Sequence, residues 1–239
     1  MSTTLGQPDN TASASVVGNT LMAFTNSMEA EQKTNLLYLL GYAQLQAVQN
    51  FGHDPKVDPS GYYGSVGDML ERVGIEKPYL DFKPHPTSAS TLQPDLVVLE
   101  VLSDTVPSDE LAVVKASLAA LRTTSTDSAG PWSIVTGHAV SATTGGFSVA
   151  LADQRMGPDG TKSLTVNLGA FLVSGSIPPK DFLWTASPSA SFAMQFASAS
   201  FTVPDDFWYQ PGVRETIVQA MQSQSAGYIA ELPALHVTA

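Results

Sequence analysis

The sequence contains no cysteine. That absence excludes disulfide cross-links, thiol catalysis, thiolate metal sites and attachment of a lipid to a thiol. It leaves the redox compartment open, because a chain without thiols folds equally well in oxidising and reducing surroundings.

Basic residues are also scarce, with 11 Lys and Arg against 22 Asp and Glu and a net charge of −11. They occur singly along the chain from Lys33 to Arg214. Nucleic acids bind clusters of Lys and Arg that release counterions, and anionic lipids attract similar clusters. We therefore expect no nucleic-acid partner and no simple electrostatic attraction to anionic lipid.

Long apolar runs are absent as well. Residues 34–53 lack Asp, Glu, Lys and Arg, but polar residues such as Asn35 and Gln44 interrupt the apolar stretch, which favours a buried helix over a membrane-spanning one. Residues 1–15 have neither a basic residue nor an apolar core, so they do not resemble a secretory signal. We expect synthesis in the cytoplasm and, for any chain outside the cell, release by a non-classical route.

Helical periodicity dominates the first half of the chain. Apolar residues recur at helical spacing in residues 26–50, 61–73 and 108–122. The aliphatic run 96–102 fits a helix or a buried strand, and we favour a helix because Pro94 and Asp95 are start signals. A short edge strand is a further expectation for residues 79–83.

After Gly130 the period changes to two, which predicts strands. They are expected at residues 132–140, 147–151, 164–172, 182–187 and 192–203, before a helix that begins near Pro211. Short turns between strands predict antiparallel pairing.

The expected fold is α+β, with a helical N-terminal half packed on a largely antiparallel sheet from the C-terminal half, and a C-terminal helix. We expect a flexible tail at 1–18, one domain at 19–230 and a C-terminal tail at 231–239. A split into two domains near residues 123–130 is disfavoured, because each half alone would expose an apolar face.

No arrangement of residues predicts catalysis. The histidines His53, His85, His138 and His236 lack metal-ligand spacing, and there is no nucleophile elbow, phosphate loop or calcium loop. We expect no catalytic residue, no metal site and no cofactor. Glu100 lies within an aliphatic run, where a desolvated carboxylate would have a raised pKa and be a candidate functional group, but a place at the edge of a packed helical stripe explains it better.

Aromatic residues supply the candidate contact site. Phe207, Trp208 and Tyr209 are consecutive, so they cannot all face one core, and at least one should touch solvent, a partner or lipid. Trp132 and Trp184 are better explained as core residues. The charge-free stretch 182–204 fits a strand in a bilayer or a strand of an ordinary sheet, and we favour the ordinary sheet.

Several phrases carry a resemblance to known proteins: Leu36 to Leu40, Val97 to Leu102, Glu110 to Val114 and Phe182 to Trp184. Over about residues 26–221 the chain resembles the Erwinia virulence factor Evf family and, more distantly, the Cyt-type insecticidal toxins. The resemblance implies a layered α/β fold and a non-enzymatic role in host colonisation or membrane interaction. The Evf protein carries a lipid on a cysteine, and this chain has no cysteine.

Three hypotheses for function follow. The leading one is a non-enzymatic virulence or toxin-like factor that interacts with membranes or lipid through Phe207, Trp208 and Tyr209. The second is a structural or self-assembling protein, a homo-oligomer, because charge is low and the strands are neutral. The third is an enzyme whose site is not visible in the sequence.

Overall fold

The chain is described here by a computed structural model that covers residues 11–86, 90–157, 160–176, 182–189 and 191–237. Its centre is a seven-stranded sheet in the order β3-β8-β6-β5-β2-β1-β9. All neighbours pair antiparallel except β2 and β5, which run parallel. The strands are β1 (Ser13–Val17), β2 (Thr20–Phe24), β3 (Lys83–Pro84), β5 (Thr144–Met156), β6 (Lys162–Gly175), β8 (Phe192–Pro204) and β9 (Ile229–Glu231).

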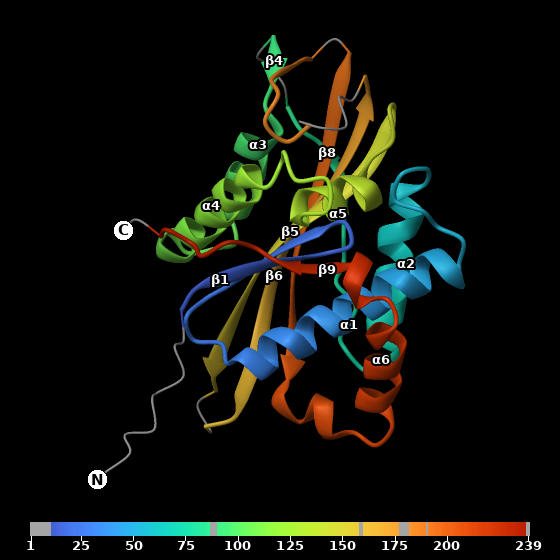
Figure 1. The fold of residues 1–239 in the computed structure, drawn as a ribbon, viewed down its shortest axis with the longest axis vertical. Coiled ribbons are helices and arrows are strands. Elements are labelled where there is room, and N and C mark those ends of the chain that lie inside the picture. Colours follow the sequence, from blue (N-terminus) through green and yellow to red (C-terminus); the bar gives the residue numbers. More distant parts are fainter. Residues whose placement is uncertain (1–10, 87–89, 158–159, 177–181, 190, 238–239) are drawn as a thin grey trace.

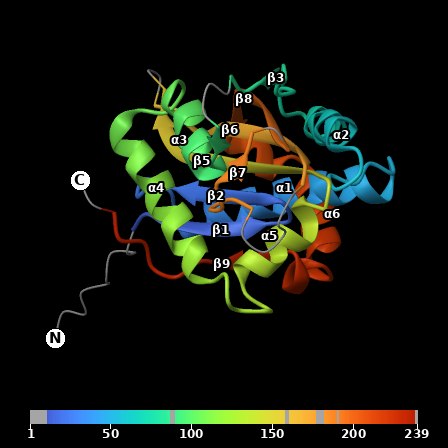
Figure 2. The ribbon, with the colours of Figure 1, turned by 90° about the horizontal axis from the view of Figure 1, so that it is seen from above.

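Helices cover both faces of this sheet, as Figures 1 and 2 show. Leu21 and Ala23 of β2 belong to the apolar cluster on one face, and Met22 and Phe24 belong to the cluster on the other. This alternation buries a strand on both sides. One face carries α3 (Pro94–Ser103), α4 (Ser108–Thr123) and α5 (Pro131–Ala139), and the opposite face carries α1 (Ala30–Gln49), α2 (Pro59–Arg72) and α6 (Val213–Gln222).

The expected α+β class is confirmed, as are the main helices and the long strands β5, β6 and β8. The ambiguous run 96–102 is helical, with Pro94 in the first turn of α3 and Asp95 beside it. Proline is compatible with a helix start because its missing N–H has no partner there. Helices on both faces of the sheet add a layer that the sequence analysis did not specify.

The prediction of a strand at residues 132–140 is wrong, because these residues form α5. Pro131 starts this helix, and Trp132, Val135 and Ala139 are buried at helical spacing. The helix contacts β1, β5 and β9. Over so short a segment, its apolar residues fit both the helical period of 3.6 and the strand period of two. Packing on the sheet therefore selects the helix.

The expected tail at residues 1–18 contains a strand of the sheet. Val16 and Val17 of β1 are fully buried, and β1 pairs with β2 on one side and with β9 on the other. Gly18 turns the chain between β1 and β2 with a φ of +51°, a value that favours glycine. The expected C-terminal tail also begins inside structure, because Glu231 pairs with Ser15.

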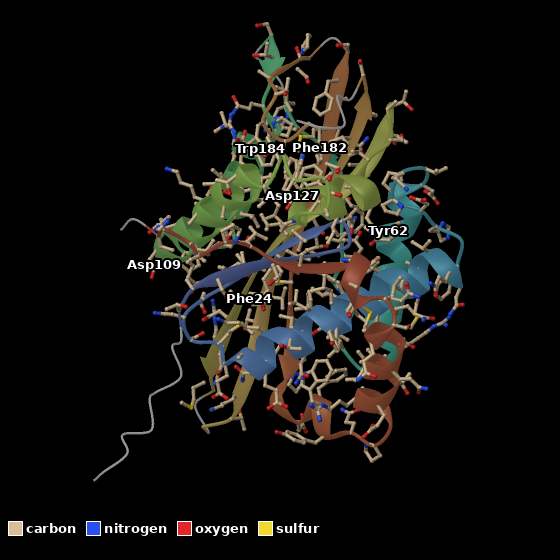
Figure 3. All side chains as sticks on the ribbon, viewed as in Figure 1. Phe24, Tyr62, Asp109, Asp127, Phe182 and Trp184 are labelled. Atoms are coloured by element: carbon tan, nitrogen blue, oxygen red, sulfur yellow. The ribbon has the colours of Figure 1, made fainter. Side chains whose placement is uncertain are left out.

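Two other predicted strands are much shorter than expected. Only Lys83–Pro84 of the region near 79–83 forms a strand, β3. The region 182–187 forms turns around the buried residues Phe182 and Leu183, followed by β7 (Ser187–Pro188), which pairs with β4 (Thr91–Leu92). The side chain of Trp132 stacks on Phe182, with 5.4 Å between ring centroids. Aromatic packing thus replaces strand pairing in this region, where Figure 3 labels Phe182.

Candidate functional site

The three consecutive aromatics lie on a short 3₁₀ helix, η1 (Asp205–Tyr209), between β8 and α6. Phe207 is 1 % exposed and Trp208 is 8 % exposed, whereas Tyr209 is 83 % exposed. A 3₁₀ helix has three residues per turn, so successive side chains point about 120° apart. The structure therefore places two of the candidate residues in the core and presents Tyr209 at the surface.

The buried pair holds the turn in place. The rings of Phe207 and Trp208 meet edge to face, with 4.9 Å between their centroids. Both belong to the apolar cluster beneath α1 and α6. Tyr209 is thus an exposed ring on a segment whose two preceding side chains are fixed by packing.

A second exposed apolar residue lies at the same end of the molecule. Met156, at the end of β5, is 69 % exposed and stands opposite Lys162 at the start of β6. The next residue of β6, Ser163, stands opposite Pro204, which ends β8 just before η1. A groove of about 690 Å³ runs between the β5–β6 connection and η1, and Lys162 and Tyr209 both line it. We call it the hairpin groove.

A second groove of about 450 Å³, the α1–α6 groove, lies on the other side of Tyr209. Its lining is Glu29, Glu31, Gln32, Asn35, Lys162, Trp208, Tyr209, Gln210, Pro211, Arg214 and Glu215. Both cations in this lining are ion-paired: Lys162 Nζ lies 3.4 Å from Glu29 Oε1, and Arg214 Nη2 lies 3.3 Å from Glu31 Oε1. The two grooves share Lys162 and Tyr209, so they form one continuous surface.

Two polar groups in the α1–α6 groove have no protein partner. Asn35 of α1 is 8 % exposed, and no hydrogen bond joins its side-chain amide to another described residue. The indole N–H of Trp208 is buried and likewise finds no acceptor among the described residues. The Trp208 N–H is closed to solvent, and leaving such a group unpaired is costly. The Asn35 amide is open to the groove, so a ligand or solvent can supply the hydrogen bonds that it lacks.

His53, His85 and His138 each make a polar contact within the protein. His53 Nδ1 lies 2.7 Å from Asp58 Oδ2, and Asp58 Oδ1 accepts the N–H of Gly61 at 3.0 Å, which caps α2. That N–H, and secondly His53, lowers the pKa of Asp58. His85 Nε2 lies 3.3 Å from Glu100 Oε2, whose side chain is 69 % exposed, so Glu100 faces the edge of the α3 stripe rather than a desolvated site.

His138 is half-buried on α5. Its Nε2 lies 3.3 Å from the carbonyl oxygen of Gly227, and its ring packs edge to face on Tyr228, with 4.6 Å between centroids. Burial lowers the pKa of His138, and the Gly227 carbonyl opposes that effect. Within the described parts of the chain, no three or more His, Asp and Glu side chains gather as metal ligands would.

Three contributors to this end of the molecule were not singled out from the sequence. Met156 ends β5 and Lys162 begins β6, so both lie well before η1 in the chain. Asn35 lies on α1, more than a hundred residues before Met156. The one signal in the sequence for Asn35 was its polar side chain within residues 34–53, a stretch that lacks Asp, Glu, Lys and Arg. Nothing in the sequence spacing joins it to Tyr209, because sheet register and the packing of α6 on α1 bring them together.

No family model matches the chain, and no curated protein matches it. Among solved structures, it is similar to the Evf virulence factor, with 10% identity, a TM-score of 0.41 and coverage of 84% of this chain and 77% of that one. It is also similar to a delta-endotoxin, with 13% identity, a TM-score of 0.41 and coverage of 85% and 87%.

A third similar structure is the activated Cyt2Ba monomer from Bacillus thuringiensis subsp. israelensis, with 10% identity, a TM-score of 0.39 and coverage of 77% and 96%. These are the two groups that the sequence phrases resemble. At such identities the likeness concerns the fold alone.

Proposed function

We propose that this chain is a non-enzymatic virulence or toxin-like factor that attaches to membrane lipid through the end of the molecule carrying Tyr209 and Met156. The observation that carries the proposal is the geometry of η1, where Tyr209 is 83 % exposed while Phe207 and Trp208 are locked in the core. The exposed ring is therefore a property of the fold rather than of a loose loop.

Tyrosine suits the boundary between water and hydrocarbon, because its ring is apolar and its hydroxyl stays hydrated. Met156 adds a flexible apolar side chain on the other side of Lys162. Lysine can bury its methylene chain while the ammonium group stays in water. Full burial of a large apolar side chain is worth about 1.5–3 kcal/mol, so two such residues support reversible attachment.

Charge directs the attachment to uncharged surfaces. The net charge is −11, and Glu29 and Glu31 already pair with Lys162 and Arg214 at this end. Anionic lipid attracts clusters of basic side chains that stand free of acidic partners. We therefore expect neutral lipid surfaces to be preferred. No helix within the described residues is both long and apolar enough to cross a bilayer, so the proposal concerns contact with a surface.

A vesicle experiment tests this function. Co-sedimentation with phosphatidylcholine vesicles should pellet the protein, and Tyr209→Ala should weaken binding by about 10- to 100-fold, which is the equilibrium equivalent of losing one buried aromatic side chain. The matched control is Tyr79→Ala, since Tyr79 is 82 % exposed but lines neither groove. Absence of binding to neutral and anionic vesicles, or equal losses for the two variants, would rule the proposal out.

Self-association is a second candidate, favoured by the outer edge of β8. This strand pairs along its whole length with β6, but on its other side it pairs with β3 only at Gln195 and Phe196, within the described residues. The exposed side chains of β8 beyond that point are neutral: Ser198, Ser200, Thr202 and Pro204. Uncharged, unpaired edges accept other strands. Light scattering that shows a monomer at every concentration would exclude this candidate.

A further inference from the structure

We propose that the α1–α6 groove is a binding site for one uncharged sugar unit of a glycan. The groove lies beside Tyr209, but binding of a sugar there requires no attachment to lipid. Its volume, about 450 Å³, falls within the range of about 300–1,000 Å³ usual for small-molecule sites.

The side chains that line the groove offer hydrogen-bond donors and acceptors suited to hydroxyl groups. Gln32, Asn35 and Gln210 contribute amides, and Glu215 contributes a carboxylate that forms no ion pair with a described residue. An amide offers donors and acceptors side by side, and a carboxylate offers two acceptors. Adjacent hydroxyl groups of a pyranose are both donors and acceptors at a similar spacing, so they can bridge such groups.

One group open to the groove, the Asn35 amide, lacks the partner that a ligand would supply. The Asn35 amide, on a residue 8 % exposed, and the buried indole N–H of Trp208 make no hydrogen bond with the described protein. The Trp208 N–H is closed to solvent, so the Asn35 amide is the one of the two within reach of a ligand. A ligand hydroxyl can both donate to the Asn35 amide oxygen and accept from the amide N–H groups, so it suits this position better than an apolar ligand does.

Ion pairing inside the groove argues against a charged ligand. Lys162 and Arg214 are both paired, with Glu29 and Glu31, so a phosphate or an acidic sugar would have to displace a carboxylate. The lining carries three carboxylates and two cations, which leaves little charge to attract a cationic ligand strongly. An uncharged, hydroxyl-rich ligand meets neither obstacle.

Tyr209 supplies the apolar part of the site. Its exposed ring stands at the rim that the two grooves share. The C–H groups on one face of a pyranose form an apolar surface that can stack on such a ring, removing apolar area from water. Because Phe207 and Trp208 fix η1, the ring loses little freedom when a ligand binds.

Saturation-transfer NMR on the full chain tests the site, with the methyl glycosides of glucose, galactose, mannose and N-acetylglucosamine as probes. At least one should receive saturation. Asn35→Leu and Tyr209→Ala should each weaken that binding about tenfold, as expected for the loss of about 1.4 kcal/mol. Tyr79→Ala is the matched control and should leave the binding unchanged. Glucose 6-phosphate and sialic acid should bind more weakly than the neutral probe.

Circular dichroism and a thermal melt confirm that each variant is folded. If Asn35→Leu does not fold, Tyr209→Ala tests the site alone, because the Tyr209 side chain is 83 % exposed and does not pack in the core. The proposal is overturned if no neutral glycoside receives saturation, if binding survives both variants, or if the charged probes bind as well as the neutral ones.

Vesicles with and without a neutral glycosylceramide separate this inference from membrane attachment. Asn35→Leu leaves Tyr209 and Met156 in place, so it should abolish only the extra binding caused by the glycolipid. Binding to plain phosphatidylcholine without any response to glycosides would support the proposed function and refute the sugar site. Binding of glycosides without any binding to vesicles would support the sugar site and refute the proposed attachment to lipid.

Discussion

Asn19, in the turn between β1 and β2, links three distant parts of the chain by hydrogen bonds. Its Nδ2 donates to the carbonyl oxygen of Gly146 at 2.8 Å and to Tyr63 Oη at 3.3 Å. Its Oδ1 accepts from Tyr62 Oη at 2.9 Å (Figure 3 labels Tyr62). Burial raises the pKa of both tyrosines, so both hydroxyls remain protonated and able to donate. A buried hydrogen-bond network of this kind fixes one arrangement of the elements.

Replacing Tyr62 with Phe tests this network. The variant leaves Asn19 Oδ1 buried without its donor, and the free energy of unfolding should fall by about 1–3 kcal/mol. Urea denaturation measures the change. Tyr209→Phe removes the same atom from an exposed ring and should leave stability unchanged. Equal effects of the two substitutions would contradict the role assigned to the network.

His138 should make stability depend on pH. Burial lowers its pKa in the folded chain below the ordinary value of 6.5, and the nearby Lys56 acts in the same direction while Asp54 opposes it. As the pH falls through 6.5, the unfolded chain therefore binds the proton first, and the folded state loses stability. Above that value the effect vanishes.

The measurement is a series of urea titrations from pH 8 to pH 5 on the natural chain and on His138→Gln. The natural chain should lose more stability over this interval than the variant does. A difference between the two that stays constant with pH, or that grows in the opposite direction, would show that His138 is not disfavoured in its charged form.

Among the elements, α5 is where packing overrides local pattern. Residues 132–140 alternate well enough to predict a strand, yet they lie as a helix against β1, β5 and β9. The neighbouring aromatic cluster helps to hold this region, since the ring centroids of Trp184 and Trp132 are 4.3 Å apart. Figure 3 labels Trp184. Such contacts join residues about fifty positions apart and leave no local trace in the sequence.

A glycine in α5 gives a direct test of its conformation. A Cβ added to Gly137 would meet no atom within 4 Å. In a helix, Gly137→Ala should raise the free energy of unfolding by about 0.5–1 kcal/mol, because alanine loses less backbone freedom on folding. Gly137→Val should gain less, since β-branching disfavours a helix and favours a strand. A larger gain for Val than for Ala in a denaturation experiment would contradict the helix.

At the scale of the whole molecule, the acidic charge should set the lipid preference. Adding phosphatidylserine to phosphatidylcholine vesicles should not strengthen co-sedimentation, and low salt should not strengthen it either, because the net charge is −11. Binding that rises with the anionic fraction would show that Lys162 and Arg214 act as free cations, contrary to their pairing with Glu29 and Glu31.

The sequence by itself determined the features that depend on composition and short range. These are the charge, the absence of thiols, the helices α1 to α4, the long alternating strands β5, β6 and β8, and the requirement that three consecutive aromatics divide between core and surface. Each follows from periodicity, start signals or the geometry of neighbouring residues, and none needs a distant partner.

Only the tertiary structure decided the rest. It placed β1 and β2 between β9 and β5, made residues 131–139 helical, selected Tyr209 as the exposed aromatic, and brought Asn35, Met156 and Lys162 to the same end of the molecule. Those outcomes depend on contacts between residues far apart in the chain. Strand register and helix packing fix such contacts, and one sequence read locally carries no record of them.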